Sequence, residues 1–174
     1  MRALLLMLAL IAALALACGD DDDSDSGGGG GGQTETAEEP SPSAQREELR
    51  DTGTKPVIPK PSGSPPRRLQ KEDIVRGKGP AAKPGNTLTV HYAGVTFTTG
   101  DEFEASWNSG QPYSFPLGAG AVIPGWDKGL AGMKKGGRRM LTIPPELAYG
   151  SQGSPPAIGP NETLVFVVDL LEIQ

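Results

Sequence analysis

Apolar and polar residues alternate in short runs from about residue 69 onward, and these runs predict β-strands. Residues 87–92 alternate, which places Leu88, Val90 and Tyr92 on one face of a half-buried strand. Residues 163–173 contain a run that is apolar on both faces, so this segment is expected to be a central, buried strand. Further strands are expected at residues 69–75, 113–117 and 138–143, and residues 102–106 are expected to form a short strand or a bulge.

The stretch 111–133 ends with helical rather than strand spacing. Pro124 favours a first helical turn because its φ is already close to the helical value. Trp126, Leu130 and Met133 follow at i, i+4 and i+7, on one helical face. These residues either belong to an ordinary core or line an apolar pocket, and the spacing fits both. The whole pattern predicts an α+β fold, with an antiparallel five- to six-stranded sheet curved around one short helix.

The first 18 residues have the pattern of an export signal. Arg2 precedes an almost purely apolar run over residues 3–17, which is shorter than the ~20 residues of a membrane-spanning helix. Cys18 is the only cysteine and directly follows small residues, as in a bacterial lipoprotein. We therefore expect residues 1–17 to be a lipoprotein signal peptide and Cys18 to be lipidated. The alternative is an ordinary secretory signal with an incidental cysteine.

Residues 18–66 are expected to form a disordered tether. They contain an Asp-rich run, a glycine run at residues 27–32 and many Pro and Ser residues, with few large apolar side chains. Such a composition cannot offset the entropy lost on ordering, although a weak helical turn is possible around residues 44–49. Residues 19–66 carry a net charge of −7, whereas the predicted domain, residues 67–174, carries +1. This domain therefore lacks the basic character that nucleic-acid binding requires.

Few groups for polar catalysis are present in the predicted domain. His91 is the only histidine, and alternation places it opposite Leu88, Val90 and Tyr92 as a solvent-side or hydrogen-bonded strand residue. The domain has no cysteine, no nucleophile elbow and no phosphate-binding loop. We therefore expect no metal and no cofactor. Four cations beside a predicted turn are expected to be solvated: Lys134, Lys135, Arg138 and Arg139.

The side chains that remain for chemistry are aromatic and hydroxylic. Rotation of an Xaa–Pro peptide bond suits such a set, because it needs no nucleophile. Its barrier of ~18–20 kcal/mol reflects amide resonance, which the twisted transition state has lost. A dry apolar pocket disfavours the polar planar amide relative to the twisted form. A fixed donor to the substrate carbonyl adds to this difference.

Seven segments of the predicted domain form a specific set in their order and spacing. They are residues 90–94 (Val-His-Tyr-Ala-Gly), 103–106 (Phe-Glu-Ala-Ser), 115–118 (Phe-Pro-Leu-Gly), 122–130 (Val-Ile-Pro-Gly-Trp-Asp-Lys-Gly-Leu), 133–139, 141–150 (Leu-Thr-Ile-Pro-Pro-Glu-Leu-Ala-Tyr-Gly) and 164–166 (Leu-Val-Phe). With these segments the chain closely resembles the FKBP-type peptidyl-prolyl cis-trans isomerases over about residues 69–173. The resemblance favours the pocket interpretation of the stretch 111–133.

The resemblance implies a role for each pocket residue. Trp126 would form the floor beneath the proline ring, Tyr149 would donate its hydroxyl to a substrate carbonyl, and Glu104 would complete the catalytic set. The substrate-binding residues would be Tyr92, Phe103, Tyr113, Val122, Ile123 and Phe166. The backbone N–H of Ile123 would bond to the substrate.

The chain departs from the family pattern at three positions. Glu104 stands where aspartate is usual, and its longer arm moves the carboxylate by about one methylene. Tyr113 stands where Phe is common. Ser154 stands where some members have histidine, in the loop 151–159 that would lean over the pocket. The preference for the residue before proline is therefore expected to differ from that of other members.

We expect an extracytoplasmic, lipid-anchored isomerase that acts as a monomer on proline-containing segments of exported proteins. Lipid at Cys18 would be its only contact with the membrane, and it would have no nucleic-acid partner. Two other functions stay open. One is a non-catalytic module that binds proline segments or acts as a chaperone, which only Glu104 favours. The other is a display or adhesion protein that uses the fold as a scaffold. Secretion without lipid is the alternative localisation.

Overall fold

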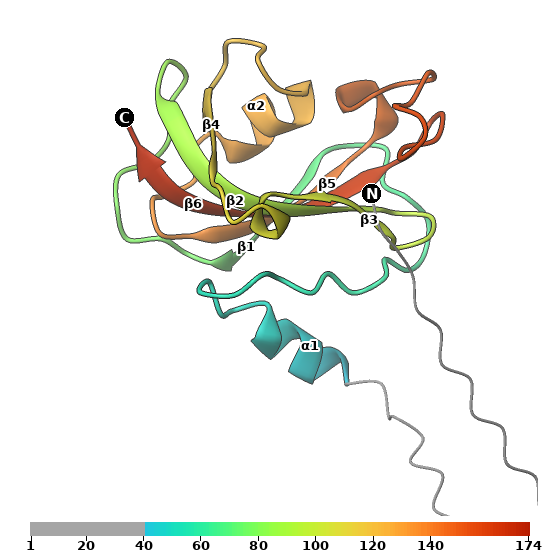
Figure 1. The fold of residues 1–174 in the computed structure, drawn as a ribbon, viewed down its shortest axis with the longest axis horizontal. Helices are drawn as coiled ribbons and strands as arrows, with labels where there is room; N and C mark the ends of the chain where they lie inside the picture. The colour runs from blue at the N-terminus through green and yellow to red at the C-terminus, as the bar shows by residue number, and fades with distance from the viewer. Residues whose placement is uncertain (1–40) are drawn as a thin grey trace, which may run out of the picture. The chain divides into compact units, whose positions relative to one another are not determined.

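Figure 1 shows the protein as a computed structural model that describes residues 41–174. The predicted signal peptide, Cys18 and the first part of the predicted tether lie outside the described residues. Within the described part, no helix is long and apolar enough to cross a bilayer. The elements in chain order are α1 (Pro42–Glu48), β1 (Gln70–Val75), β2 (Thr87–Thr96), β3 (Glu102–Ala105), the 3-10 turn η1 (Ser106–Asn108), β4 (Tyr113–Pro116), α2 (Pro124–Leu130), β5 (Arg138–Ile143), the 3-10 turn η2 (Pro145–Leu147) and β6 (Leu164–Ile173).

The strands form one six-stranded antiparallel sheet, as the sequence predicted. The strand order is β1-β5-β6-β2-β3, and β4 pairs with the first part of β2. β6 lies between β5 and β2 and is buried from Leu164 to Leu170. The prediction of a central, buried strand at this position is therefore confirmed.

β2 is longer than predicted. It continues to Thr96 instead of ending at Tyr92, because it pairs with both β6 and β3 there. Residues 93–95 are buried, so this part of the strand has no polar alternation that would reveal it in the sequence. Gly94 is required by close packing: a Cβ at this position would lie 2.7 Å from the rings of Phe103 and Phe166.

α2 covers one face of the sheet, which we call the inner face (Figure 1). Trp126 and Leu130 of α2 belong to the same buried cluster as Leu141 and Ile143 of β5. Gly129 allows the helix to approach β5 closely, since a Cβ there would lie 2.8 Å from the Leu141 side chain. The core therefore lies between α2 and the sheet, as predicted.

The helix ends earlier than the sequence predicted, at Leu130 rather than Met133. Arg139 lies beside this end and donates from Nη1 to the Gly129 carbonyl at 2.8 Å. A buried cation thus satisfies a carbonyl that the helix itself leaves unpaired. Met133 is still buried, at 2% exposure, but it reaches the core from the turn that follows the helix.

Two of the four cations predicted to be solvated are buried. Arg138 is fully buried and forms a bidentate ion pair with Asp169, with both N–O distances 2.6 Å. Arg139 is 8% exposed and pairs with Asp73 at 2.6 Å. The prediction was wrong for these two residues because they already belong to β5, which lies inside the sheet rather than at its edge.

The structure also differs from the predicted tether over residues 41–66. α1 is followed by a segment, residues 49–60, that we call the strap; both lie against the face of the sheet opposite α2, the outer face (Figure 1). Leu49 is only 4% exposed, and Pro56 is also buried. The composition did not reveal this packing, because the strap has no continuous apolar run. Two buried apolar residues, Leu49 and Pro56, and the backbone carbonyls of the strap hold it against the sheet.

Candidate active site

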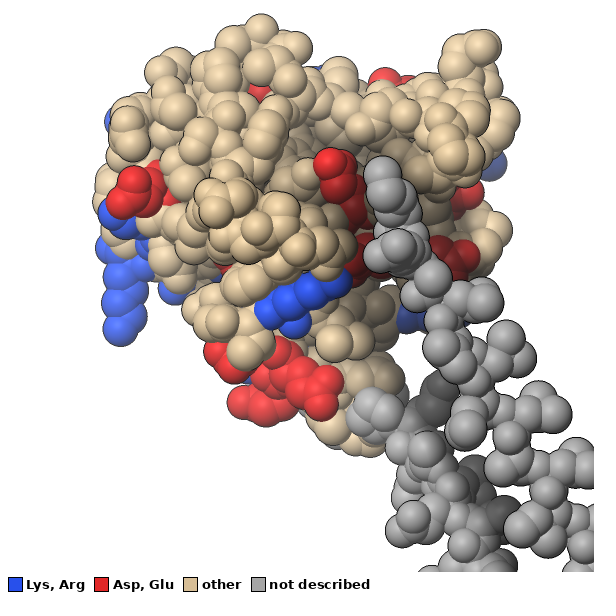
Figure 2. Space-filling view, in the orientation of Figure 1, with Lys and Arg blue, Asp and Glu red and all other residues tan. Residues whose placement is uncertain are grey.

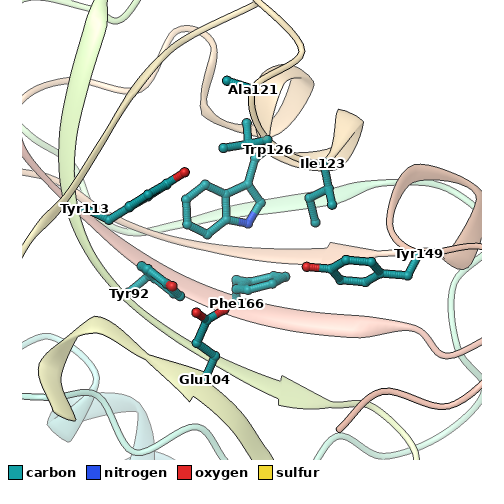
Figure 3. Close-up of a pocket in the computed structure, with 9 residues that line it drawn as sticks. Tyr92, Glu104, Tyr113, Ala121, Ile123, Trp126, Tyr149 and Phe166 are labelled. Atoms are coloured by element: carbon teal, nitrogen blue, oxygen red, sulfur yellow. The ribbon is translucent and has the colours of Figure 1, made fainter. Parts of the chain in front are cut away.

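The inner face of the sheet contains a cavity of about 420 Å³ beside the start of α2 (Figure 3). Three of the residues that line it carry hydroxyl or carboxyl groups that point toward one another in Figure 3: Tyr92, Glu104 and Tyr149. The complete lining is Tyr92, Glu104, Tyr113, Ala121, Val122, Ile123, Trp126, Tyr149 and Phe166.

Trp126 forms the floor of the cavity. Pro124 starts the helix, and the Trp126 N–H closes the first turn onto the Ile123 carbonyl at 2.9 Å. The side chain is 4% exposed, so only part of the ring faces the opening. Its Nε1 has no hydrogen-bond partner among the described residues. The floor therefore offers an apolar face, and the buried indole N–H contributes no hydrogen bond to it.

Aromatic rings from three strands surround this floor. The Tyr92 ring of β2 lies edge-on to Trp126 with centroids 5.0 Å apart, and the Phe166 ring of β6 lies edge-on at 5.3 Å. Phe115 of β4 supports Trp126 from the core at 5.5 Å, and Tyr113 stacks on Phe115 at 5.7 Å. Such edge-to-face packing fixes the rings as a rigid wall.

The rim at Val122 and Ile123 is held by a carboxylate on the helix. Asp127 of α2 accepts hydrogen bonds from the backbone N–H groups of Gly118 at 2.8 Å and Gly120 at 3.1 Å. Both glycines have positive φ, 79° and 70°, which other residues rarely adopt. The helix and the loop that precedes it are therefore coupled at the mouth of the cavity.

A β-bulge in β3 determines how this strand contributes to the site. Gly94 pairs with Glu104 and Val95 pairs with Glu102, so two residues of β3 stand against one step of β2. Glu104 lines the cavity, and the Phe103 ring packs edge-on against Phe166 at 5.4 Å. Phe103 and Glu104 therefore both point to the inner face. In a regular strand, two consecutive side chains would point to opposite faces.

The hydroxyls of Tyr92 and Tyr149 are kept protonated. Burial raises the pKa of Tyr92, and the neighbouring Glu104 carboxylate raises it further because it stabilises the neutral phenol. Burial, and then the charge of Glu104, likewise raises the pKa of Tyr149. Tyr149 is still 39% exposed. At neutral pH it is therefore an accessible hydroxyl donor at the edge of an apolar cavity.

The structure brings eight of the nine predicted site residues to the cavity wall. The exception is Phe103, which lies behind Phe166 and supports it. Ala121 was not predicted, although its position directly before Val122 was an available signal. No residue of the loop 151–159 lines the cavity. The role of each residue in catalysis or binding stays a prediction.

His91 lies on the outer face, away from the cavity. Its Nδ1 is 2.9 Å from the Ser106 hydroxyl, and its ring stacks on Trp107 with centroids 4.3 Å apart. The prediction of a hydrogen-bonded strand residue is therefore confirmed. Among residues 41–174, no group of three or more His, Cys, Asp or Glu side chains is arranged to hold a metal ion.

Comparison with known families identifies this arrangement. Residues 79–171 match the family described as FKBP-type peptidyl-prolyl cis-trans isomerase. The chain belongs to this family. The matched region includes all nine residues that line the cavity, together with the bulge in β3 and the whole of α2.

Relatives with the same domain are similar over most of their length. An FK506-binding protein of Streptomyces anulatus is 55% identical over 120 residues, which cover 68% of this chain and 97% of the relative. A probable FK506-binding protein of Corynebacterium glutamicum is 50% identical over 117 residues, covering 67% of this chain and 97% of the relative. The crystal structure of AtFKBP13 superposes with a TM-score of 0.57 at 38% identity and covers 61% of this chain and 93% of that one.

Proposed function

We propose that this FKBP domain catalyses cis–trans rotation of Xaa–Pro peptide bonds, with its aromatic cavity as the active site. The observation that carries the proposal is the combination of a buried Trp126 floor with the protonated Tyr149 hydroxyl at the cavity edge. The floor accepts a flat apolar ring, and the hydroxyl can donate to a carbonyl beside it. Membership of the isomerase family supports this reading.

The reaction requires the substrate amide to lose its resonance, at a barrier of ~18–20 kcal/mol. The planar amide is the more polar state, so an environment poor in water raises its free energy relative to the twisted state. Tyr92, Trp126 and Phe166 provide such an environment around the proline ring. Exclusion of water favours the twisted state, so the rotation needs neither a nucleophile nor a cofactor.

Two hydrogen bonds beside the floor would hold the substrate in a bent conformation. We assign the Tyr149 hydroxyl as donor to a substrate carbonyl, and the Ile123 N–H as the second donor to the substrate. Glu104 raises the pKa of both neighbouring phenols. Its role in catalysis would then be to keep these groups as donors and to set the polarity of one wall.

Exchange NMR on an Ala-Leu-Pro-Phe type peptide tests this function directly. We expect the mature chain, residues 18–174, to accelerate cis–trans exchange, and Trp126→Ala to abolish the acceleration. Trp126→Phe should retain part of it, because a smaller ring still covers the floor. Saturable peptide shifts without faster exchange would instead establish a binding module, and the catalytic proposal would be wrong.

A pair of tyrosine variants tests the assigned donor. Tyr149→Phe should lower kcat/KM about tenfold, the effect of one lost hydrogen bond in the transition state. Tyr113→Phe is the matched control, since it removes a hydroxyl from the same cavity at a residue to which no bond with the substrate is assigned. It should change kcat/KM less than about twofold. Equal effects of the two substitutions would contradict the assignment.

We also propose that the enzyme works as a monomer outside the cytoplasm, anchored to the membrane by lipid on Cys18. The apolar run at residues 3–17 and the single cysteine that follows it support this location. Its substrates would be proline-containing segments of exported proteins. Mass spectrometry of the protein from its native membrane should give a lipid-modified Cys18 at the new N-terminus; an unmodified mature chain would refute the anchor.

A further inference from the structure

The strap on the outer face is bonded to two strands that lie far apart in the sheet. On β5, Arg138 donates from Nη1 to the Leu49 carbonyl at 3.0 Å and from Nη2 to the Thr54 carbonyl at 2.8 Å. Arg138 is itself fixed by its bidentate pair with Asp169. Lys55 directly follows Thr54, so the bond from Arg138 to the Thr54 carbonyl also fixes the backbone of Lys55.

Lys55 reaches from this position to β3 and η1. Its Nζ donates to Glu102 Oε1 and to Asn108 Oδ1, both at 2.8 Å, and Asn108 Nδ2 donates to the same Glu102 oxygen at 3.1 Å. The three side chains thus form a closed set of hydrogen bonds. Burial opposes ionisation of Glu102, but the bonds from Lys55 and Asn108 outweigh it and lower the pKa of this carboxyl.

Glu102 is the residue directly before the bulge that serves the active site. β3 has four residues, is an edge strand and pairs only with β2, so few backbone bonds determine its position. The bulge at Phe103 turns this residue and Glu104 to the inner face. A bond that fixes Glu102 on the outer face therefore also fixes how the next two residues are presented.

We propose that Lys55 is a positioning residue for the isomerase site. It acts through Glu102 and the bulge to place the Phe103 ring behind Phe166 and the Glu104 carboxylate in the cavity. This inference rests on the proposed function, since it extends the catalytic unit to a segment on the opposite side of the sheet. The strap is then part of the enzyme rather than part of its tether.

The match to the Streptomyces anulatus protein is longer than the predicted domain. It covers 68% of the 174-residue chain, which is more than the 108 residues from Arg67 to Gln174 can supply. The similar region therefore begins upstream of Arg67.

The charges of the Lys55 pair are partly exposed, with side-chain exposures of 38% for Lys55 and 33% for Glu102. Exposed pairs contribute little to global stability. Loss of the pair is therefore expected to leave the fold intact but to change the position of β3. This separates a positioning role from a purely stabilising one.

The test compares Lys55→Met with Lys60→Met in the mature chain. Lys60 lies in the same strap and contacts the Gly100 turn with its aliphatic stem, but it is not part of the Lys55 hydrogen-bond set. We expect Lys55→Met to lower kcat/KM about fivefold with an unchanged melting temperature, and Lys60→Met to leave kcat/KM unchanged. The amide shifts of Phe103 and Glu104 should move in the first variant alone.

A double-mutant cycle with Glu104→Gln shows whether the effect passes through the cavity carboxylate. We expect Lys55→Met to cause little further loss of kcat/KM in the Glu104→Gln background. Unmoved shifts at Phe103 and Glu104 would overturn the inference. An equal loss in both backgrounds would overturn the part of it that acts through the Glu104 carboxylate. If the wild-type chain did not accelerate exchange, the proposed function would fail instead, while the amide shifts would still decide whether Lys55 positions β3.

Discussion

The two faces of the sheet use polar groups in opposite ways. On the inner face, Tyr92, Glu104 and Tyr149 bring hydroxyl and carboxyl groups to a cavity of about 420 Å³. On the outer face, Arg138 and Asp169 are buried and form an ion pair, and Arg138 also donates hydrogen bonds to the strap. Figure 2 shows charged side chains gathered around α1 and the strap, whereas the surface near α2 is mostly uncharged.

The rigidity of this domain lies mainly on the outer face of the sheet. A catalytic cavity must leave donors available for a substrate, so its polar groups contribute little to holding the fold together. The outer face has no such requirement and can pair every charge it buries. The strap connects the two faces, because Lys55 bonds to Glu102 of β3 on one side and Glu104 of the same strand lines the cavity on the other.

The largest effect is expected from breaking the outer ion pair. Arg138→Met leaves the Asp169 carboxylate buried without its partner and should lower the free energy of unfolding by about 3–5 kcal/mol. Urea denaturation measures this loss. Arg138→Met combined with Asp169→Leu should recover most of it, since no charge is then left unpaired. A loss below about 1 kcal/mol in the single variant would mean that the pair is not the anchor of the outer face.

An intermediate effect is expected from alkaline pH, which acts on the inner face. The pKa values of Tyr92 and Tyr149 are raised in the folded state. The unfolded chain releases these protons at about pH 10, while the folded chain still holds them. Stability is therefore fully present below pH 10 and falls as pH rises above it.

Phenolate absorbance measures this difference. It should rise at higher pH in the folded protein than in denaturant, and Glu104→Gln should reduce the gap, because the carboxylate then no longer opposes ionisation. Coincident titration curves for folded and unfolded protein would contradict the environment assigned to the two phenols.

The smallest effect is expected at the exposed cations of the turn before β5. Lys135 is exposed, and Lys135→Met should change the free energy of unfolding by less than about 0.5 kcal/mol. Arg138, three residues later, serves as the contrast in the same urea experiment. A loss comparable to that of Arg138→Met would show that the distinction between solvated and buried cations in this segment is wrong.

Much of the inner face could be predicted because its signals are local. The alternation at Leu88, Val90 and Tyr92 and the helical spacing of Trp126 and Leu130 follow from the periods of strand and helix. These residues are buried in the structure on the faces that were expected. The resemblance to a known family then indicated which of the apolar residues surround a cavity rather than fill a core.

The outer face could not be predicted because its contacts join distant parts of the chain. Arg138 looks like one more cation beside a turn, and its partner Asp169 is 31 residues away. The strap resembles the polar tether that precedes it, since Arg138 holds it through backbone carbonyls that every residue possesses. No local pattern marks a carbonyl as the acceptor of a bond from a residue more than 80 positions away.

The strands, the helix and the set of aromatic side chains could all be predicted from the sequence, because periodicity and side-chain type are properties of short segments. The sequence left open whether residues 102–106 form a regular strand or a bulge, and the folded structure shows that β3 is bulged, so that Phe103 and Glu104 both serve the inner face. Only the tertiary structure decided that Arg138 is buried and that residues 49–60 pack on the sheet. Burial and hydrogen bonding in these cases depend on strand neighbours, and strand order is a property of the folded chain as a whole.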